Sequence, residues 1–236
     1  METLSFLDKQ VTLWLNSFYC SFADLFFYLS TSMLVWVPLF VVLICIIFLR
    51  QGGQGLVTLL VVAAVILVAD QMSSHILKPL FERFRPSHDP IVQYLVHVVN
   101  DYRGGSYGFV SSHSANCFGV ATFLALVIRS KSLNIAMFAW ALINCYSRIY
   151  LGVHYVGDIV CGALLGAVIA RLFYELYLHA SLHFFVINHH NKWTLKQGLA
   201  AMFGRVEPFC ASVVFWISVL MLVIISFFLT KHGITC

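Results

Sequence analysis

Long apolar runs, separated by short polar stretches, dominate the pattern of residues along the chain. A helix needs roughly 20 residues to cross a hydrocarbon core about 30 Å thick, and several of these runs reach that length. They predict six transmembrane helices, over about residues 26–49, 55–77, 110–129, 133–150, 155–177 and 208–230. Too little polar sequence remains for a separate soluble domain. We therefore expect an all-α fold, a polytopic membrane helix bundle.

The first 24 residues differ from these runs because they are amphipathic. Apolar side chains recur there at helical spacing, at Leu4, Leu7, Val11, Trp14 and Phe18, while polar ones fall elsewhere around the wheel. This predicts a helix that lies in the membrane interface rather than across it. We therefore divide the chain into an interfacial helix over residues 1–24 and a transmembrane domain over 25–236. No removable signal peptide is expected, since the start lacks a basic segment and a cleavage site.

Composition and charge exclude several classes of function. Of the 236 residues 61% are hydrophobic and 10% are charged, whereas soluble domains have about 45–50% and 25%. The net charge is +4, but the basic residues are dispersed, so we expect no nucleic-acid partner. The seven cysteines lie mostly within predicted spans and without CxxC spacing, which predicts neither a disulfide framework nor a zinc site.

Ionisable residues at the ends of spans are informative, because burying them is costly and they tend to face a cavity or a partner. If the six spans alternate in direction, eight such residues lie on one side of the membrane: Lys78, Arg85, Ser111, Ser112, His113, Arg148, His154 and Asp158. The longest loop on that side, 78–109, contains the segment DYRGGSYG and is placed to cover or gate a site. The other long loop, 178–207, lies on the opposite side.

Two local patterns have ordinary explanations when each is taken alone. Lys78 and Arg85 flank a span in KPLFERFRP, where Pro79 is expected to end the helix, and basic residues often anchor spans to headgroups. Ser111 precedes an apolar run and is a good N-cap, and His113 follows it. The same helix start also offers free N–H groups and a positive dipole end to a phosphate.

A third pattern, SRIYLGVHYVGD, is more specific. His154 and Asp158 are four residues apart, so on one helix they share a face. The carboxylate can accept the proton of one ring nitrogen, which leaves the other nitrogen free to attack. A structural histidine–aspartate pair is the alternative, and the neighbouring Arg148 favours the reactive interpretation.

Together these residues supply the parts for phosphoryl transfer. Three cations can hold a phosphate dianion: Lys78, Arg85 and Arg148. The helix start at 111–113 adds N–H donors. His154, oriented by Asp158, can attack phosphorus to give a phosphohistidine, after which His113 protonates the leaving oxygen and activates water. Because the cations neutralise the charge that a metal handles elsewhere, we expect no metal ion and no cofactor.

In these residues the chain resembles the type 2 phosphatidic acid phosphatases, a family that includes lipid phosphate phosphatases and vanadium haloperoxidases. Its signature has three parts, K-x6-RP, PSGH and SR-x5-H-x3-D. The first and third are complete here, as Lys78, Arg85 and Pro86, and as Ser147, Arg148, His154 and Asp158. The middle part reads Val110-Ser111-Ser112-His113, so the family glycine is replaced by Ser112. This side chain either gives its hydroxyl to the phosphate or displaces the phosphate slightly.

The resemblance covers about residues 70–165 and implies a role for each matching residue. Five bind phosphate: Lys78, Arg85, Ser111, Ser112 and Arg148. His113 is the acid, His154 the nucleophile and Asp158 its orienting partner. The implied protein is a bacterial lipid phosphatase, with undecaprenyl diphosphate as the first choice of substrate and the 1-phosphate of lipid A, phosphatidylglycerophosphate and phosphatidic acid as alternatives. A lipid or anion transporter is the alternative of another class, but we find neither broken spans nor an internal repeat.

The basic residues also predict an orientation. Seven lie on the side away from the site: Arg50, Arg129, Lys131, Arg171, Lys192, Lys196 and Arg205. Seven lie on the site side: Lys9, Lys78, Arg83, Arg85, Arg103, Arg148 and Lys231. Three of the latter belong to the predicted site, which leaves four against seven. By the positive-inside rule we expect the site to face the periplasmic side of a bacterial inner membrane.

Two further features have structural interpretations. Gly162 and Gly166 form a GxxxG motif in the fifth predicted span, which favours close packing of that helix inside the bundle. Asp70 lies inside the second span, where an acid is costly. Since it is about 12 Å along the helix from Lys78, we expect it to make a structural hydrogen bond.

Overall fold

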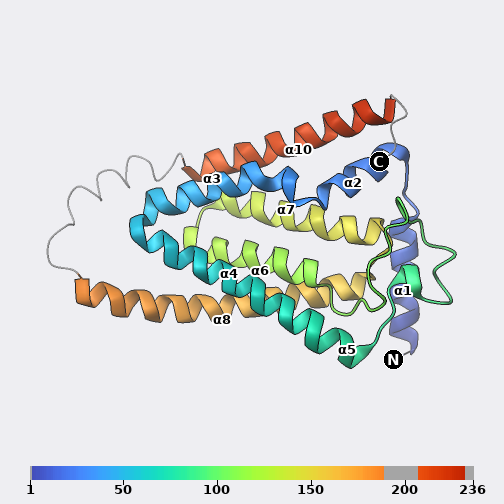
Figure 1. Ribbon diagram of the computed structural model, residues 1–236, viewed down its shortest axis with the longest axis horizontal. Coiled ribbons are helices and arrows are strands. Elements are labelled where there is room, and N and C mark those ends of the chain that lie inside the picture. The colour runs from blue at the N-terminus through green and yellow to red at the C-terminus, as the bar shows by residue number, and fades with distance from the viewer. Residues whose placement is uncertain (1, 189–206, 232–236) are drawn as a thin grey trace.

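In the computed structural model the chain is a bundle of long helices, with one helix lying across an end (Figure 1). The structure describes residues 2–188 and 207–231. Within these ranges no strand forms, and Phe84 and Tyr107 make one isolated bridge. The prediction of an all-helical membrane bundle is confirmed.

The helices follow one another along the chain. They are α1 (Glu2–Asn16), α2 (Ser21–Ser30), α3 (Met33–Gln51), α4 (Gly55–Gln71), α5 (Lys78–Phe81), α6 (Ser112–Ile128), α7 (Lys131–Tyr150), α8 (Val156–Asn188) and α10 (Glu207–Lys231). The longest described connection, residues 82–111, joins α5 to α6. A π-helical turn, η2 (Met72–Leu77), joins α4 to α5, and short 3-10 turns form η1 (Gly52–Gln54) and η3 (Pro86–His88).

Three helical runs in the described residues are long and apolar enough to cross a membrane, Met33–Phe81, Val156–His179 and Cys210–Lys231. The first run folds back at η1, so that α3 and α4 lie side by side (Figure 1). The shorter helix Ser112–Ile128 is also apolar. The count of six spans stays a prediction.

The helix boundaries differ from the predicted ones in places with local causes. The first predicted span is broken before Met33, where the hydroxyls of Ser30 and Thr31 bond to carbonyls three residues back and so compete with the helical pattern. Pro79 does not end its helix, which continues to Phe81 directly after the wider π turn.

The fifth predicted span, 155–177, is longer than expected. α8 continues to Asn188 because residues 178–188 contain neither glycine nor proline. The rest of the predicted loop 178–207, with residues 189–206, lies outside the described residues.

Close packing of α6 against α8 sets the positions of the predicted site residues. A Cβ atom added to Gly162 would come 2.5 Å from the carbonyl oxygen of Ser111, and one added to Gly166 would collide with the carbonyl oxygen of Ala115. Glycine therefore lets the two backbones touch, as the GxxxG motif predicts. The contact brings the start of α6 beside the start of α8.

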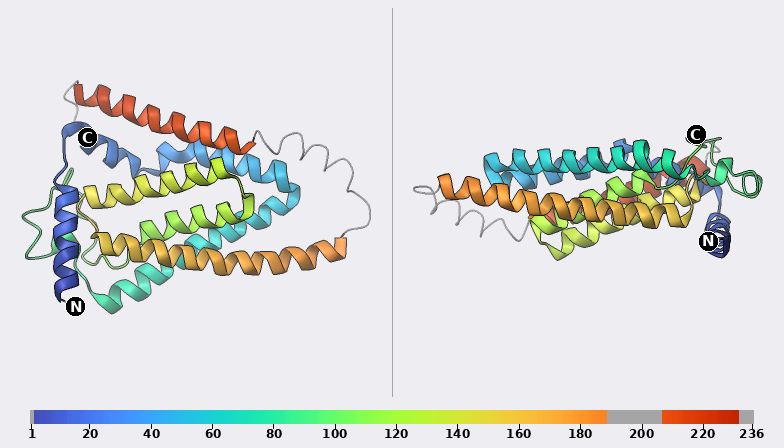
Figure 2. Two further views of the ribbon diagram at one scale, coloured as in Figure 1. Left: turned by 180° about the vertical axis from the view of Figure 1, so that it is seen from behind. Right: turned by 90° about the horizontal axis from the view of Figure 1, so that it is seen from below.

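The N-terminal helix lies across the end of the bundle where α7 ends and α8 begins (Figure 2). Two of its polar residues, Thr12 and Asn16, are buried against the bundle, whereas Leu4, Leu7 and Trp14 are exposed. Asn16 bonds to the carbonyl oxygens at the end of α7. The predicted 1–24 helix is shorter than expected, because α1 ends at Asn16 and α2 begins at Ser21.

Candidate active site

The predicted site residues meet at the end of the bundle that α1 crosses. Lys78 comes from α5, His113 from the first turn of α6, Arg148 from the last turn of α7 and Asp158 from the first turn of α8. Arg85 and His154 come from the loops that lead out of α5 and into α8.

His154 is buried between a carboxylate and a guanidinium. Its Nδ1 lies 3.5 Å from Oδ2 of Asp158, without the geometry of a hydrogen bond, and its Nε2 lies 3.4 Å from Nη1 of Arg85. Such contacts are often long in free enzymes and tighten when substrate binds. Burial, together with the charges of Arg85 and Arg148, lowers the pKa of His154 well below its usual value. The imidazole is therefore neutral near pH 7 and its nitrogen lone pair is available for attack.

Within the described residues, the two arginines of the site have no acidic partner. Arg85 and Arg148 are buried, yet in the described part of the chain no carboxylate lies within ion-pair distance of either one. Burial and repulsion from Arg148 lower the pKa of Arg85. Buried charges are normally paired. Two buried guanidiniums that have no carboxylate partner among the described residues therefore indicate a binding site for an anion.

Lys78 is held by two hydroxyl groups, one at the start of α6 and one in η2. Its Nζ donates to Oγ of Ser112 at 2.5 Å and to Oγ of Ser74 at 3.4 Å. The two hydroxyls are 3.0 Å apart, so the serine that replaces the family glycine orients the lysine. Asp70 accepts a long bond from Ser74, at 3.5 Å, which agrees with its expected structural role.

Ser111 caps α6, as predicted from its position before the apolar run. Its Oγ accepts a hydrogen bond from the N–H of Ser114, and its own N–H donates to the carbonyl oxygen of Asp158 at 3.1 Å. The cap thus ties the start of α6 to α8. A direct contact of Ser111 with phosphate stays a prediction.

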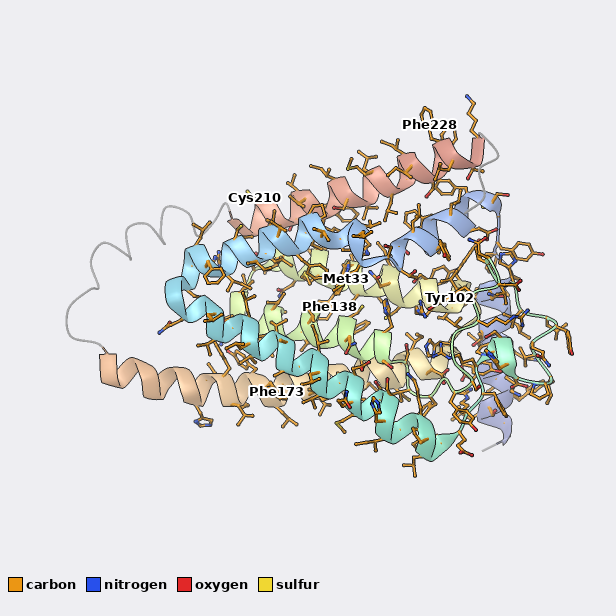
Figure 3. The ribbon with its side chains drawn as sticks, in the orientation of Figure 1. Met33, Tyr102, Phe138, Phe173, Cys210 and Phe228 are labelled. Atoms are coloured by element: carbon orange, nitrogen blue, oxygen red, sulfur yellow. The ribbon has the colours of Figure 1, made fainter. Side chains whose placement is uncertain are left out.

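The loop with DYRGGSYG covers the arginines. The backbone N–H of Arg85 donates to Ser106 and its Nε to the carbonyl oxygen of Tyr107, while Nη2 of Arg148 donates to the hydroxyl of Tyr102 at 3.0 Å. Figure 3 places Tyr102 at the end of the bundle that α1 crosses. A Cβ atom added to Gly108 would come 2.9 Å from Asp158. The loop covers the site as expected, and gating by it stays a prediction.

Sequence reasoning missed three residues that contact the site. Arg83 donates to Oδ1 of Asp158 at 2.9 Å, Tyr102 bonds to Arg148, and Asn144 lines the same cavity as His113. Arg83 and Tyr102 lie in the segments KPLFERFRP and DYRGGSYG, but nothing in a sequence distinguishes an anchor at the membrane surface from a partner of a catalytic group. Asn144 is a polar residue inside a predicted span, which is the signal that marks it.

His113 lies where two cavities meet. One, of about 420 Å³, is also lined by Tyr102 and Arg148. The other, of about 450 Å³, runs between α3, α4, α6 and α7 and is lined mostly by apolar side chains, among them Met33 and Trp36. Figure 3 shows Met33 in the body of the bundle and Tyr102 near its end. Nε2 of His113 is buried without a hydrogen-bond partner in the described residues.

Comparison with known proteins agrees with this arrangement. Residues 56–182 match the PAP2 superfamily. A lipid A 4'-phosphatase of Bacteroides thetaiotaomicron is 40% identical over 74% of this chain and 78% of its own length, and one of Porphyromonas gingivalis is 35% identical over 76% and 77%.

Among solved structures, the transmembrane PAP2-type phosphatidylglycerolphosphate phosphatase of Bacillus subtilis superimposes with a TM-score of 0.55 at 25% identity, over 76% of this chain and 88% of that protein. Two curated relatives above 30% identity and a family match over more than half the chain lead to one conclusion. The chain belongs to the PAP2 superfamily, as its three motifs predict, and is a membrane phosphatase of that superfamily.

Proposed function

We propose that this protein removes a phosphate from a membrane lipid of the lipid A type through a phosphohistidine at His154. The observation that carries the proposal is that Arg85 and Arg148 are buried without a carboxylate partner in the described part of the chain, and that Arg85 lies beside a neutral His154. A phosphate dianion supplies the negative charge that this cluster lacks. The adjoining cavity supports a lipid, because its mostly apolar lining offers a site for a hydrocarbon chain of the substrate.

The reaction follows from the positions of the two histidines. Nε2 of His154 attacks phosphorus, a P–N bond forms, and the bond from phosphorus to the leaving oxygen breaks. That oxygen takes a proton from His113, while Lys78, Arg85 and Arg148 stabilise the charge on the phosphoryl oxygens. Water then gives a proton to His113 and attacks phosphorus, and the P–N bond breaks to release inorganic phosphate and neutral His154.

The identity of the lipid rests on the relatives. Both relatives named above are called lipid A 4'-phosphatases, so we place the 4'-phosphate of lipid A first. Undecaprenyl diphosphate, which the sequence favoured, becomes the second candidate, together with the 1-phosphate of lipid A. The 4'-phosphate is an ester of a sugar alcohol, a poor leaving group that needs protonation. His113, at the junction of the polar and apolar cavities, fits that requirement.

We further propose six spans, with the site on the periplasmic face of a bacterial inner membrane. The structure adds Arg83 to the site, through its bond to Asp158, so it no longer counts as a topogenic charge. The balance of basic residues then becomes seven against three, which supports the orientation more strongly than the sequence count did.

The test measures phosphate release by the purified protein in nanodiscs, with excess EDTA in the buffer. We expect kcat/KM for lipid A that carries a 4'-phosphate to exceed that for undecaprenyl diphosphate at least tenfold, a difference of about 1.4 kcal/mol. His113→Asn should reduce the rate more on the sugar phosphate than on the diphosphate, because the diphosphate leaves as a phosphate monoester that depends less on protonation.

The opposite preference would show that the lipid is wrong while the reaction class stands. Release that depends on added divalent metal would contradict the role of the three cations. No release from any lipid phosphate would reject the proposed function.

A further inference from the structure

Arg83 connects the catalytic carboxylate to the N-terminal helix. Its Nη1 donates to Oδ1 of Asp158 at 2.9 Å and its Nη2 to Oδ2 of Asp8, in α1, at 2.6 Å. The guanidinium lies 4.3 Å from the ring centroid of Tyr155, which limits its movement. A single side chain therefore bridges two carboxylates that are 150 residues apart in the sequence.

Side chains of α1 also satisfy the first N–H groups of α8. The N–H of Gly157 donates to Oδ1 of Asp8 at 2.8 Å, and that of Val156 donates to Oγ1 of Thr12 at 3.1 Å. These groups have no partners within their own helix. A Cβ atom on Gly157 would come 2.7 Å from Oδ2 of Asp8, so the absence of a side chain there leaves room for Asp8 beside Arg83.

The two oxygens of Asp158 have separate partners. Oδ2 accepts the N–H of Tyr155 at 3.0 Å and faces His154, whereas Oδ1 is bonded to Arg83. Asp158 is fully buried, and a buried charge that loses its partner is strongly unfavourable. Without Arg83 the carboxylate would therefore turn or take up a proton, and in either case it would no longer orient the imidazole.

We propose that Arg83 is a positioning residue for the phosphatase reaction, and that Asp8, by binding Arg83, makes α1 part of the same network of contacts. The chain of contacts Asp8–Arg83–Asp158–His154 fixes the direction of the nucleophilic nitrogen and couples it to the seating of α1 on the bundle. Arg83 touches neither phosphate nor lipid in this role. The inference rests on the proposed function, because it concerns the same histidine.

The test compares kcat and KM for three variants in nanodiscs, with lipid A as substrate. We expect Arg83→Gln to lower kcat roughly 10- to 100-fold, as loss of an orienting partner does at other sites, with KM within about threefold. Arg83→Lys should recover part of this loss, because an ammonium can pair with Asp158 but cannot bridge both carboxylates. Asp8→Asn should lower kcat by roughly 3- to 10-fold, since a neutral acceptor binds a guanidinium less strongly.

A double-variant measurement distinguishes positioning from a general structural role. If Arg83 acts through Asp158, Arg83→Gln should lower the rate less than about threefold when Asp158→Asn is already present. The inhibition constant of inorganic phosphate, as a competitive inhibitor, should stay within threefold of the wild-type value in Arg83→Gln, because Arg85 and Arg148 still bind the anion. Arg171→Gln is the matched control. It removes an ion pair with Glu175 elsewhere on α8 and should leave kcat unchanged.

Gly157→Ala keeps every charge and tests the same network of contacts if Arg83→Gln does not fold. The added methyl should displace Asp8 and lower kcat by about the same factor as Asp8→Asn. Wild-type kcat in Arg83→Gln, or undiminished loss in the Asp158→Asn background, would overturn the inference. If the wild type releases phosphate and the variants give these results, the inference fails while the proposed function stands. If the wild type releases no phosphate, the proposed function itself is rejected.

Discussion

The outer surface of α10 exposes apolar side chains, whereas the end of the bundle near α1 buries charged and polar ones. In α10, Ile217, Leu220 and Ile224 are exposed, while Ser218 is buried and bonds to a carbonyl of its own helix. At the other place Arg85 and His154 are buried, in a network of named partners. A lipid-facing helix needs only apolar side chains of any shape. A buried charge needs a particular partner at a particular distance.

This difference explains why the two regions tolerate change so differently. On α10 one aliphatic residue can replace another, because lipid tails adapt to either. At the site, Nε2 of His113 and Nε of Arg148 are buried without a hydrogen-bond partner in the described part of the chain, and the substrate is the partner that we propose for them. Substitutions at the two places should therefore differ by orders of magnitude in their effect on turnover.

The largest contrast is expected for the nucleophile. His154→Ala should lower phosphate release by at least about 10⁴-fold, because no covalent intermediate can form. Asp158→Asn should fold and turn over about 10³- to 10⁴-fold more slowly, since the imidazole loses its orienting carboxylate. Leu220→Ala, on the exposed face of α10, should stay within twofold of wild type. Turnover at the normal rate in His154→Ala would assign the nucleophile to another residue.

The sequence predicted which polar residues lie together at one end of the bundle better than it predicted where the helices begin and end. Side chains such as Lys78, His154 and Asp158 are recognisable because phosphoryl transfer restricts their type and spacing. The break before Met33 and the extension of α8 to Asn188 depend on local hydrogen bonds and on the absence of a stop signal, and hydropathy does not register either of them.

Arg83 shows what a sequence cannot provide even inside a recognised motif. It lies between Lys78 and Arg85 in the chain, yet it bonds to Asp158 and Asp8 instead of joining the other cations. Its partners come from α8 and α1, which are far away in the sequence and meet only when α1 docks across the bundle. Contacts of that kind follow from tertiary packing, which the pattern of apolar residues does not specify.

A smaller effect is expected for the helix contact that supports the site. Gly166→Ala should destabilise the protein by about 3 kcal/mol, because the new methyl meets the backbone of α6 at Ala115 and no rotamer change relieves the clash. Gly53→Ala is the control, since nothing lies within 4 Å of the added carbon. Thermal unfolding in one detergent measures both. Equal melting temperatures for the two variants would show that α6 and α8 can separate without cost.

The smallest effect concerns the protonation state of His154. It shows whether burial or the carboxylate of Asp158 has the larger influence on the pKa of this histidine. The folded protein holds the pKa of His154 well below its usual value, whereas the unfolded chain has a value of about 6.5. Between these two values the unfolded state binds more protons, so the free energy of unfolding falls as the pH falls below about 6.5. His154→Asn lacks this proton and should lose less stability on acidification.

From pH 8 to pH 5, the free energy of unfolding of wild type should fall by up to about 2 kcal/mol more than that of the variant. This is the largest difference that a histidine kept neutral in the folded protein can contribute at pH 5. Unfolding of both proteins at pH 8, 6 and 5 in the same detergent gives this difference directly, because all other titrating groups are shared. The opposite sign, with wild type gaining stability over the variant as the pH falls, would mean that Asp158 holds a protonated imidazole. His154 would then have no free lone pair at neutral pH, and the attack on phosphorus would require a proton to leave first.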